Sequence, residues 1–275
     1  MVDVRSVIPI KYMGSKSRIA KYIVPILQKE IDDNHINVYI EPFCGGCNTI
    51  DKIKCDRKIA NDYNPYLIAL LEHVANGGGL PESVPKELYD KARAIYYKIE
   101  KAPWQEQHEV LSSSEFELWE LGAIGFLASY NARFYDGGYA KSGYEKTKNG
   151  LRYRDYYREA KDNLIKQVPL LKDIAFRTGD YRCFTVYPSP NEEYRPLIYC
   201  DPPYTNTKQF SNSQNFDYDD FWETMRIWSR KCIVYISELQ APDDFECVWE
   251  HEVSRSIKAT DKSRAVEKLF RYKGE

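Results

Sequence analysis

Residues 197–204 read Leu-Ile-Tyr-Cys-Asp-Pro-Pro-Tyr, an apolar run that ends at a carboxylate, two prolines and a tyrosine. Four consecutive apolar or aromatic residues predict a short strand that is buried on both faces. Prolines cannot continue such a strand, because they lack the N–H that the ladder requires. Asp201 and Tyr204 are therefore expected just beyond the carboxyl end of the strand, the edge at which open α/β sheets bind ligands.

The groups in this stretch suit a planar base that carries an amine. Asp201 can accept a hydrogen bond from the amine, and Tyr204 offers a flat ring for stacking. The peptides at Pro202 and Pro203 lack N–H groups, so nearby carbonyls can face a ligand without a competing donor. A plain proline-rich turn, with Asp201 as an ordinary turn residue, explains the same four residues equally well.

A second strand-and-turn unit comes earlier in the chain. Residues 38–40 predict a strand, and residues 41–46 read Glu-Pro-Phe-Cys-Gly-Gly before a predicted helix that ends near Lys54. Paired glycines let a ligand approach the backbone, as in nucleotide-binding units. The spacing is not Gly-x-Gly-x-x-Gly, so a dinucleotide is not favoured. Asp62 ends the next predicted strand and is placed to hold ribose hydroxyls, although residues 61–65 also suit a simple turn.

Composition limits the classes of protein to consider. The chain has 275 residues, a net charge of −2 and 43% hydrophobic residues, which permits one large domain with an insertion. It has neither an apolar run of about 18 residues nor a signal-peptide core, so we expect a cytoplasmic protein without a membrane span. Seven cysteines without framework spacing indicate reduced thiols. Cys44 and Cys47 have metal-pair spacing, but nothing completes a zinc site, and no metal is expected.

Predicted strands alternate with helices except between Asp62 and Asp173, a span that is too long for one crossover. Within it, helices are predicted over residues 86–100, from a capping box at Ser112 to Tyr130, and over residues 151–167. The chain is therefore predicted to form a sheet domain from residues 1–75 and 168–275, with residues 76–167 as an inserted subdomain.

The insertion carries a mildly basic stretch. Residues 133–166 contain nine Lys or Arg against five Asp or Glu. Residues 131–144 interleave aromatic, glycine and cationic residues, a pattern typical of hairpins that contact nucleic acid, although a solvated loop is an alternative. The candidate DNA-binding residues are Arg133, Tyr135, Tyr139, Lys141, Lys146 and Lys148.

Together, four motifs resemble those of the Dam-type DNA adenine-N6 methyltransferases. They are Tyr-x-Gly-x-Lys at residues 12–16, Glu-Pro-Phe-x-Gly-Gly at 41–46, Asp62, and Asp-Pro-Pro-Tyr at 201–204. The glycine motif precedes the insertion and the catalytic motif follows it, which is the order of the alpha group. The resemblance covers nearly the whole chain, and the insertion matches weakly. It implies a Rossmann-like S-adenosylmethionine-dependent methyltransferase sheet with an inserted, mainly helical subdomain that recognises double-stranded DNA.

The resemblance also implies a role for individual residues. The residues implied to bind S-adenosylmethionine are Tyr12, Lys16, Glu41, Pro42, Phe43, Gly45, Asp62, Asp180 and Tyr181. Among these, Lys16 is implied near the methionine carboxylate, and Asp180 with Tyr181 at the adenine of the cofactor. Asp201, Pro202, Pro203 and Tyr204 are implied to be catalytic, with the target base flipped out of the duplex. Cys47 departs from the glycine or small residue that family members often have.

Two other functions fit some of these motifs. Cytosine-N4 methylation requires the same amine geometry, although Asp201 favours adenine, as the resemblance implies. A catalytically silent DNA-binding module would keep the fold, but the intact Asp201, Asp62 and Gly45 argue against decay of the site. The sequence indicates no required protein partner.

Overall fold

The structure, a computed structural model, describes residues 10, 12, 14–147, 150–184, 196–203, 216–258 and 261–274. For residues 254–258 and 261–265 it describes the backbone. Two predicted site residues, Tyr204 and Lys148, lie outside the described residues.

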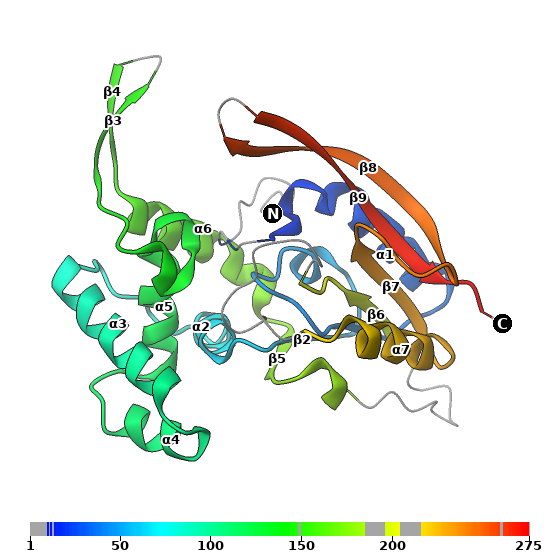
Figure 1. The fold of residues 1–275 in the computed structure, drawn as a ribbon, viewed down its shortest axis with the longest axis horizontal. Coiled ribbons are helices and arrows are strands. Elements are labelled where there is room, and N and C mark those ends of the chain that lie inside the picture. Colours follow the sequence, from blue (N-terminus) through cyan, green and yellow to red (C-terminus); the bar gives the residue numbers. More distant parts are fainter. Residues whose placement is uncertain are drawn as a thin grey trace.

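In this part of the chain, seven strands form a central sheet in the order β5-β2-β1-β6-β7-β9-β8 (Figure 1). The strands are β1 (Val38–Glu41), β2 (Arg57–Asp62), β5 (Ile174–Thr178), β6 (Pro196–Cys200), β7 (Ile233–Glu238), β8 (Phe245–Lys258) and β9 (Asp261–Tyr272). The first five strands in this order are parallel, and β9 runs antiparallel to β7 and β8. The strand order reverses between β1 and β6, which is the switch point at which open α/β sheets bind ligands.

The strand before the Asp-Pro-Pro motif is confirmed as a buried central strand. All five residues of β6 are buried, between β1 on one side and β7 on the other. The Tyr199 hydroxyl, which would be costly to bury alone, lies 2.7 Å from the Ser237 hydroxyl on β7.

Helices cover both faces of the sheet. They are α1 (Ala20–Asp33), α2 (Pro65–Ala75), α3 (Lys86–Lys101), α4 (Trp104–Ser112), α5 (Leu118–Leu127), α6 (Tyr156–Leu171) and α7 (Tyr218–Ser229). Successive strand residues point to opposite faces, so Tyr39 joins the core beneath α1 whereas Val38 and Ile40 join the core beneath α7. The predicted α/β layering is thus confirmed.

Helices α3, α4 and α5 of the predicted insertion lie at the end of the molecule opposite the C-terminus, and a β-hairpin projects on the same side (Figure 1). The hairpin consists of β3 (Gly143–Thr147) and β4 (Gly150–Arg154). Helix α5 is buried from Leu121 to Leu127, and Gly122 allows close packing on α2, because a Cβ there would lie 2.1 Å from the Tyr66 carbonyl oxygen. None of the described helices combines the length and the apolar content of a membrane span.

Several predicted helix boundaries were wrong. Ser112 ends α4 and does not begin the next helix, because Glu117 and Glu120 form the capping box of α5. Residues 151–154 belong to β4, and α6 begins only after Asp155, whose side chain accepts from the Arg158 N–H. The helix predicted to end near Lys54 is a single 3-10 turn, Ile50–Lys52.

Replacing Leu197 with alanine should test the burial of β6. Leu197 is fully buried, so Leu197→Ala should lower the free energy of unfolding by about 3 kcal/mol. The matched control is Leu151→Ala on the exposed hairpin, where the side chain is 73% exposed and the loss should stay below about 0.5 kcal/mol. Urea denaturation measures both, and equal losses would contradict the central position of β6.

Candidate active site

The predicted site residues follow neighbouring parallel strands at one edge of the sheet. Asp201 follows β6, and the glycine turn of residues 42–46 follows β1. Asp62 ends β2, and Asp180 lies two residues after β5. Because parallel strands end at the same edge, the fold brings these segments to the switch point between β1 and β6.

Asp201 forms a largely buried ion pair with Lys16. The Lys16 Nζ lies 2.5 Å from the Asp201 Oδ1, and the two side chains are 7% and 19% exposed. Burial raises the pKa of Asp201 to about 6, and the lysine charge opposes this rise because it favours the carboxylate. Lys16 thus contacts the predicted catalytic carboxylate, and its implied contact with the methionine carboxylate stays a prediction.

The glycine turn is held by Asp62. The Gly45 N–H donates to Asp62 Oδ2 and the Asn64 N–H donates to Oδ1, both at 3.0 Å. Gly45 has a φ of 47°, and a Cβ there would lie 2.9 Å from the Tyr12 ring, so only glycine fits without strain. Burial raises the pKa of Asp62. Three of the residues implied to bind the cofactor, Tyr12, Gly45 and Asp62, are therefore in contact.

Asn61 braces two of the loops, a role that the sequence analysis missed. This buried side chain donates through Nδ2 to the Pro42 carbonyl and to the Gly179 carbonyl, both at 2.9 Å. The backbone carbonyl of Asn61 accepts from the Cys44 N–H at 2.8 Å. Asn61 therefore fixes the turn after β1 to the turn after β5. The available signal was a polar side chain directly after the apolar residues Ile59 and Ala60 of β2.

An aromatic group lines the other side of the turn. Phe43 and Tyr181 lie 5.1 Å apart between ring centroids, and Tyr181 is buried with its hydroxyl donating to Asp220. Both Asp180 oxygens accept from Arg182, at 2.8 Å from Nε and 2.6 Å from Nη2, which lowers the Asp180 pKa. The implied role of Asp180 at the cofactor adenine stays a prediction, and it requires these oxygens to be shared with Arg182.

The Glu41 carboxylate and the backbone of the Asp-Pro-Pro motif also form hydrogen bonds. Glu41 is buried and accepts from the Tyr39 hydroxyl at 2.8 Å, and burial raises its pKa. The Pro203 carbonyl accepts from the Tyr218 hydroxyl at 2.6 Å, so α7 holds the backbone after Asp201. Pro202, which lies between Asp201 and Pro203 in the chain, is buried.

The predicted DNA contact of Tyr135 was wrong. Tyr135 is fully buried and its hydroxyl donates to the Leu121 carbonyl, so the ring is part of the hydrophobic core. Tyr139 is half-buried and its hydroxyl donates to the Val84 carbonyl, which also indicates a packing role. Lys141 and Lys146 are exposed and Arg133 is half-buried, and their contact with DNA stays a prediction.

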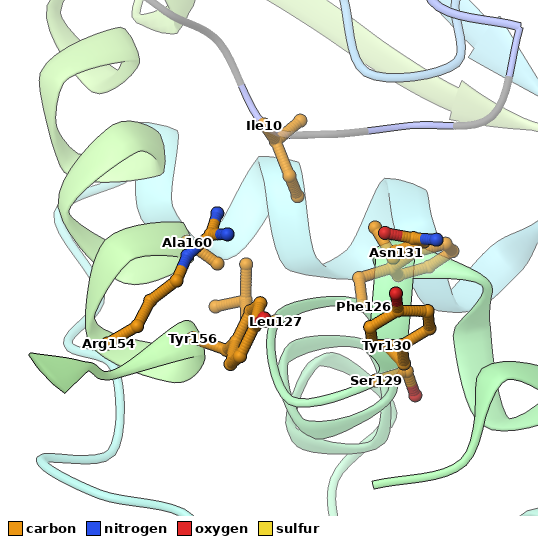
Figure 2. A pocket seen from close by; sticks show the side chains of 10 residues that line it. Ile10, Phe126, Leu127, Ser129, Tyr130, Asn131, Arg154, Tyr156 and Ala160 are labelled. Atoms are coloured by element: carbon orange, nitrogen blue, oxygen red, sulfur yellow. The ribbon is translucent and has the colours of Figure 1, made fainter. Parts of the chain in front are cut away.

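A cavity of about 90 Å³ lies where the insertion meets the N-terminal segment (Figure 2). Tyr130 and Asn131 lie on one side of it, Arg154 and Tyr156 on the other, and Ile10 faces it from the N-terminal segment. Tyr130 is 50% exposed, and the Arg154 guanidinium lies 4.5 Å from the Tyr156 ring centroid. The cavity combines the exposed Tyr130 ring and the half-buried Tyr156 ring with a cation, so it is a candidate contact for nucleic acid.

Asn61→Ala should reveal the brace. It would leave the Pro42 and Gly179 carbonyls without their donor, so we expect a loss of about 2 kcal/mol in the free energy of unfolding. Asn34→Ala is the control, because Asn34 is exposed and donates only to Glu30 at the end of its own helix. Calorimetry compares the two variants, and a loss no greater than that of Asn34→Ala would refute the brace.

Two type II methyltransferases are similar to this chain in sequence. The type II methyltransferase M.MjaIII from Methanocaldococcus jannaschii is 24% identical over 228 residues, which cover 77% of this chain and 74% of that protein. The type II methyltransferase M.FokI from Planomicrobium okeanokoites is 24% identical over 231 residues, or 78% of this chain. Those residues make up 31% of M.FokI, so the chain corresponds to about a third of that protein.

Among solved structures, the rRNA methyltransferase aviRa from Streptomyces viridochromogenes superposes with a TM-score of 0.38 and 13% sequence identity. The superposition covers 94% of this chain and 85% of that one.

One protein family matches residues 12–256, which include the N-terminal Tyr-x-Gly-x-Lys motif, the glycine turn and the Asp-Pro-Pro motif. It is described as the D12 class of N6 adenine-specific DNA methyltransferases. Since the match spans most of the chain, the chain belongs to the D12 class N6 adenine-specific DNA methyltransferases.

Proposed function

We propose that this protein methylates the N6 amine of adenine within a specific sequence of double-stranded DNA, with S-adenosylmethionine as donor and with the target base flipped out. One observation carries the proposal. The half-buried Asp201 carboxylate, paired with Lys16, follows β6 directly beside the strand whose glycine turn is fixed to Asp62. An acceptor for an amine and a turn suited to a nucleoside therefore share one sheet edge.

The residues at the switch point fit an adenosyl group. Asp62 is a half-buried acceptor at the turn whose oxygens accept from the Gly45 and Asn64 N–H groups, and we assign its remaining lone pairs to the ribose hydroxyls. Phe43 and Tyr181 supply apolar rings, and Gly45 keeps the backbone free of a side chain. When bound, S-adenosylmethionine supplies a methyl carbon made electrophilic by its positively charged sulfur.

Asp201 would act on the amine of the target base. This amine is conjugated with its ring and is a weak nucleophile, so acceptors for its hydrogens increase the electron density on nitrogen. Lys16 lies on the Oδ1 side of Asp201, and we assign Oδ2 and a carbonyl of the Asp-Pro-Pro segment to the two amine hydrogens. The catalytic advantage comes mainly from positioning and from fixed acceptors. After transfer, Asp201 is placed to take the proton that nitrogen loses.

A base inside a duplex cannot reach Asp201, so flipping is required. We assign the stacking of the flipped base to Tyr204, and DNA contact to the insertion of residues 76–167. The exposed rings of the β3–β4 hairpin, Tyr144 and Tyr153, support this assignment, as do the cavity of Figure 2 and the exposed Lys141 and Lys146. Residues 1–75 and 168–275 would then form the catalytic domain. Cytosine-N4 methylation is not favoured, because the family acts on adenine N6.

Asp201→Ala should abolish catalysis without abolishing cofactor binding. We expect methyl transfer to fall by at least about 100-fold, because the amine loses its charged acceptor. Tritium transfer from labelled S-adenosylmethionine to DNA, followed by nucleoside analysis, measures the rate and identifies the modified base. The control is Asp244→Ala, which removes a carboxylate paired with Arg226 at 2.5 Å on the far end of α7. Near-normal transfer by Asp201→Ala, or label in cytosine, would refute the proposal.

The rate of methyl transfer should follow the ionisation of Asp201. Because its pKa is raised to about 6, the acceptor form is lost as pH falls through 6, and the rate at pH 5 should be about a tenth of the plateau. Lys16→Met should move the midpoint upward, since the lysine charge holds the carboxylate ionised. Lys52→Met, which removes one partner of Asp51, is the control and should leave the midpoint in place. An unchanged midpoint in Lys16→Met would contradict this assignment.

A further inference from the structure

Gln167, to which the proposed mechanism gives no role, contacts three segments that are distant in sequence. This side chain is fully buried on α6. Its Nε2 donates to the Gly46 carbonyl and to Asp51 Oδ2, both at 3.0 Å, and its Oε1 accepts from the Ile10 N–H at 3.2 Å. The glycine turn, the 3-10 turn after it and the N-terminal segment therefore meet at one amide.

Only an amide meets these demands. The site requires a donor for a carbonyl and a carboxylate, and an acceptor for an N–H, and glutamine supplies both from one group. A glutamate would direct a second carboxylate at Asp51, and an apolar residue would leave the Gly46 carbonyl without this donor. Such buried networks are specific because each missing partner is costly.

The other end of α6 is fixed to the projecting hairpin. Helix α6 follows β4 directly, and Asp155 caps it by accepting from the Arg158 N–H at 3.0 Å. Arg154 at the end of β4 pairs with Glu159 in the first turns of α6 at 2.9 Å. The first turns of the helix are thus tied to the hairpin, while Gln167, about three turns further on, is tied to the glycine turn.

Ile10 provides a second, shorter connection. Its side chain lines the cavity of Figure 2 together with Tyr130 and Arg154. Its backbone N–H is held by Gln167, and a Cβ added at Gly46 would lie 2.9 Å from the Ile10 Cγ2. A residue that forms a wall of the candidate DNA contact therefore packs directly on the glycine turn.

We propose that Gln167 is a positioning residue that couples DNA binding at the insertion to cofactor binding at the glycine turn. This inference rests on the proposed function. DNA that orders the hairpin and the cavity fixes α6 and Ile10, and Gln167 transmits that order to the Gly46 carbonyl. By thermodynamic linkage, DNA and cofactor then raise each other's affinity by the same factor.

The test measures the coupling itself. The dissociation constant of S-adenosylhomocysteine, which allows binding without turnover, is measured with and without a duplex that contains a site mapped from wild-type methylation. The wild-type ratio should be at least about fivefold. In Gln167→Met the ratio should fall to about one, while DNA affinity without cofactor stays within about twofold of wild type. Gln28→Met is the matched control, because Gln28 also bridges to backbone groups, those of Lys54, but touches neither site.

A second variant acts at the opposite end of α6. Glu159→Ala cuts the pair with Arg154 on a partly exposed surface, so it should fold even if Gln167→Met does not. It should also lower the coupling ratio, though less than Gln167→Met does because the Ile10 connection remains, and it should leave the cofactor affinity measured without DNA unchanged. A purely structural role for Gln167 would instead weaken binding equally with and without DNA.

The outcomes separate the two proposals. A wild-type protein that binds both ligands without coupling would overturn this inference and leave the proposed function intact. A wild-type ratio that survives in Glu159→Ala, or in a folded Gln167→Met, would overturn it as well. A wild-type protein that binds neither ligand, or transfers no methyl group, would overturn both.

Discussion

The parallel pairing of β1 with β6 is the constraint on which the site depends. These strands leave the sheet at the same edge, so the glycine turn and Asp201 must lie near each other although about 150 residues separate them in sequence. The long connection between them is free to carry an insertion, because its length has little effect on stability once the strands have paired. The pairing of β1 with β6 therefore assembles the site whatever the length of the chain between them.

Burial at that edge gives the acidic residues their properties. Asp201, Glu41 and Asp62 all have raised pKa values because each is withdrawn from water. Lys16 is the cation that keeps Asp201 close to its ionised form, and Tyr39 donates to Glu41. A carboxylate with a pKa near 6 is ionised at neutral pH and can still take up a proton. The N-terminal lysine thus tunes the residue that follows β6.

Motifs whose conformation is set by local residues, such as proline and glycine, could be predicted from sequence. Residues whose role depends on tertiary contacts could not. Prolines after an apolar run located the end of β6, and paired glycines located the turn after β1. Tyr135 was misassigned because an aromatic ring among glycines and cations reads the same whether it faces solvent or a core. Gln167 was missed because its partners lie more than 100 residues away, and nothing local distinguishes it from other helical glutamines.

Residues defined by tertiary contacts also explain how a segment outside the site can hold the site in position. The surface of the insertion can vary in sequence provided that its exit helix keeps its position on the sheet, and that position is fixed by a few buried polar contacts. Gln167 supplies such contacts to the turn after β1, and Asn61 supplies them between that turn and the turn after β5. Apolar packing alone tolerates small sliding, whereas a buried amide with several partners does not. Polar braces are therefore expected where a recognition element must hold a catalytic one in register.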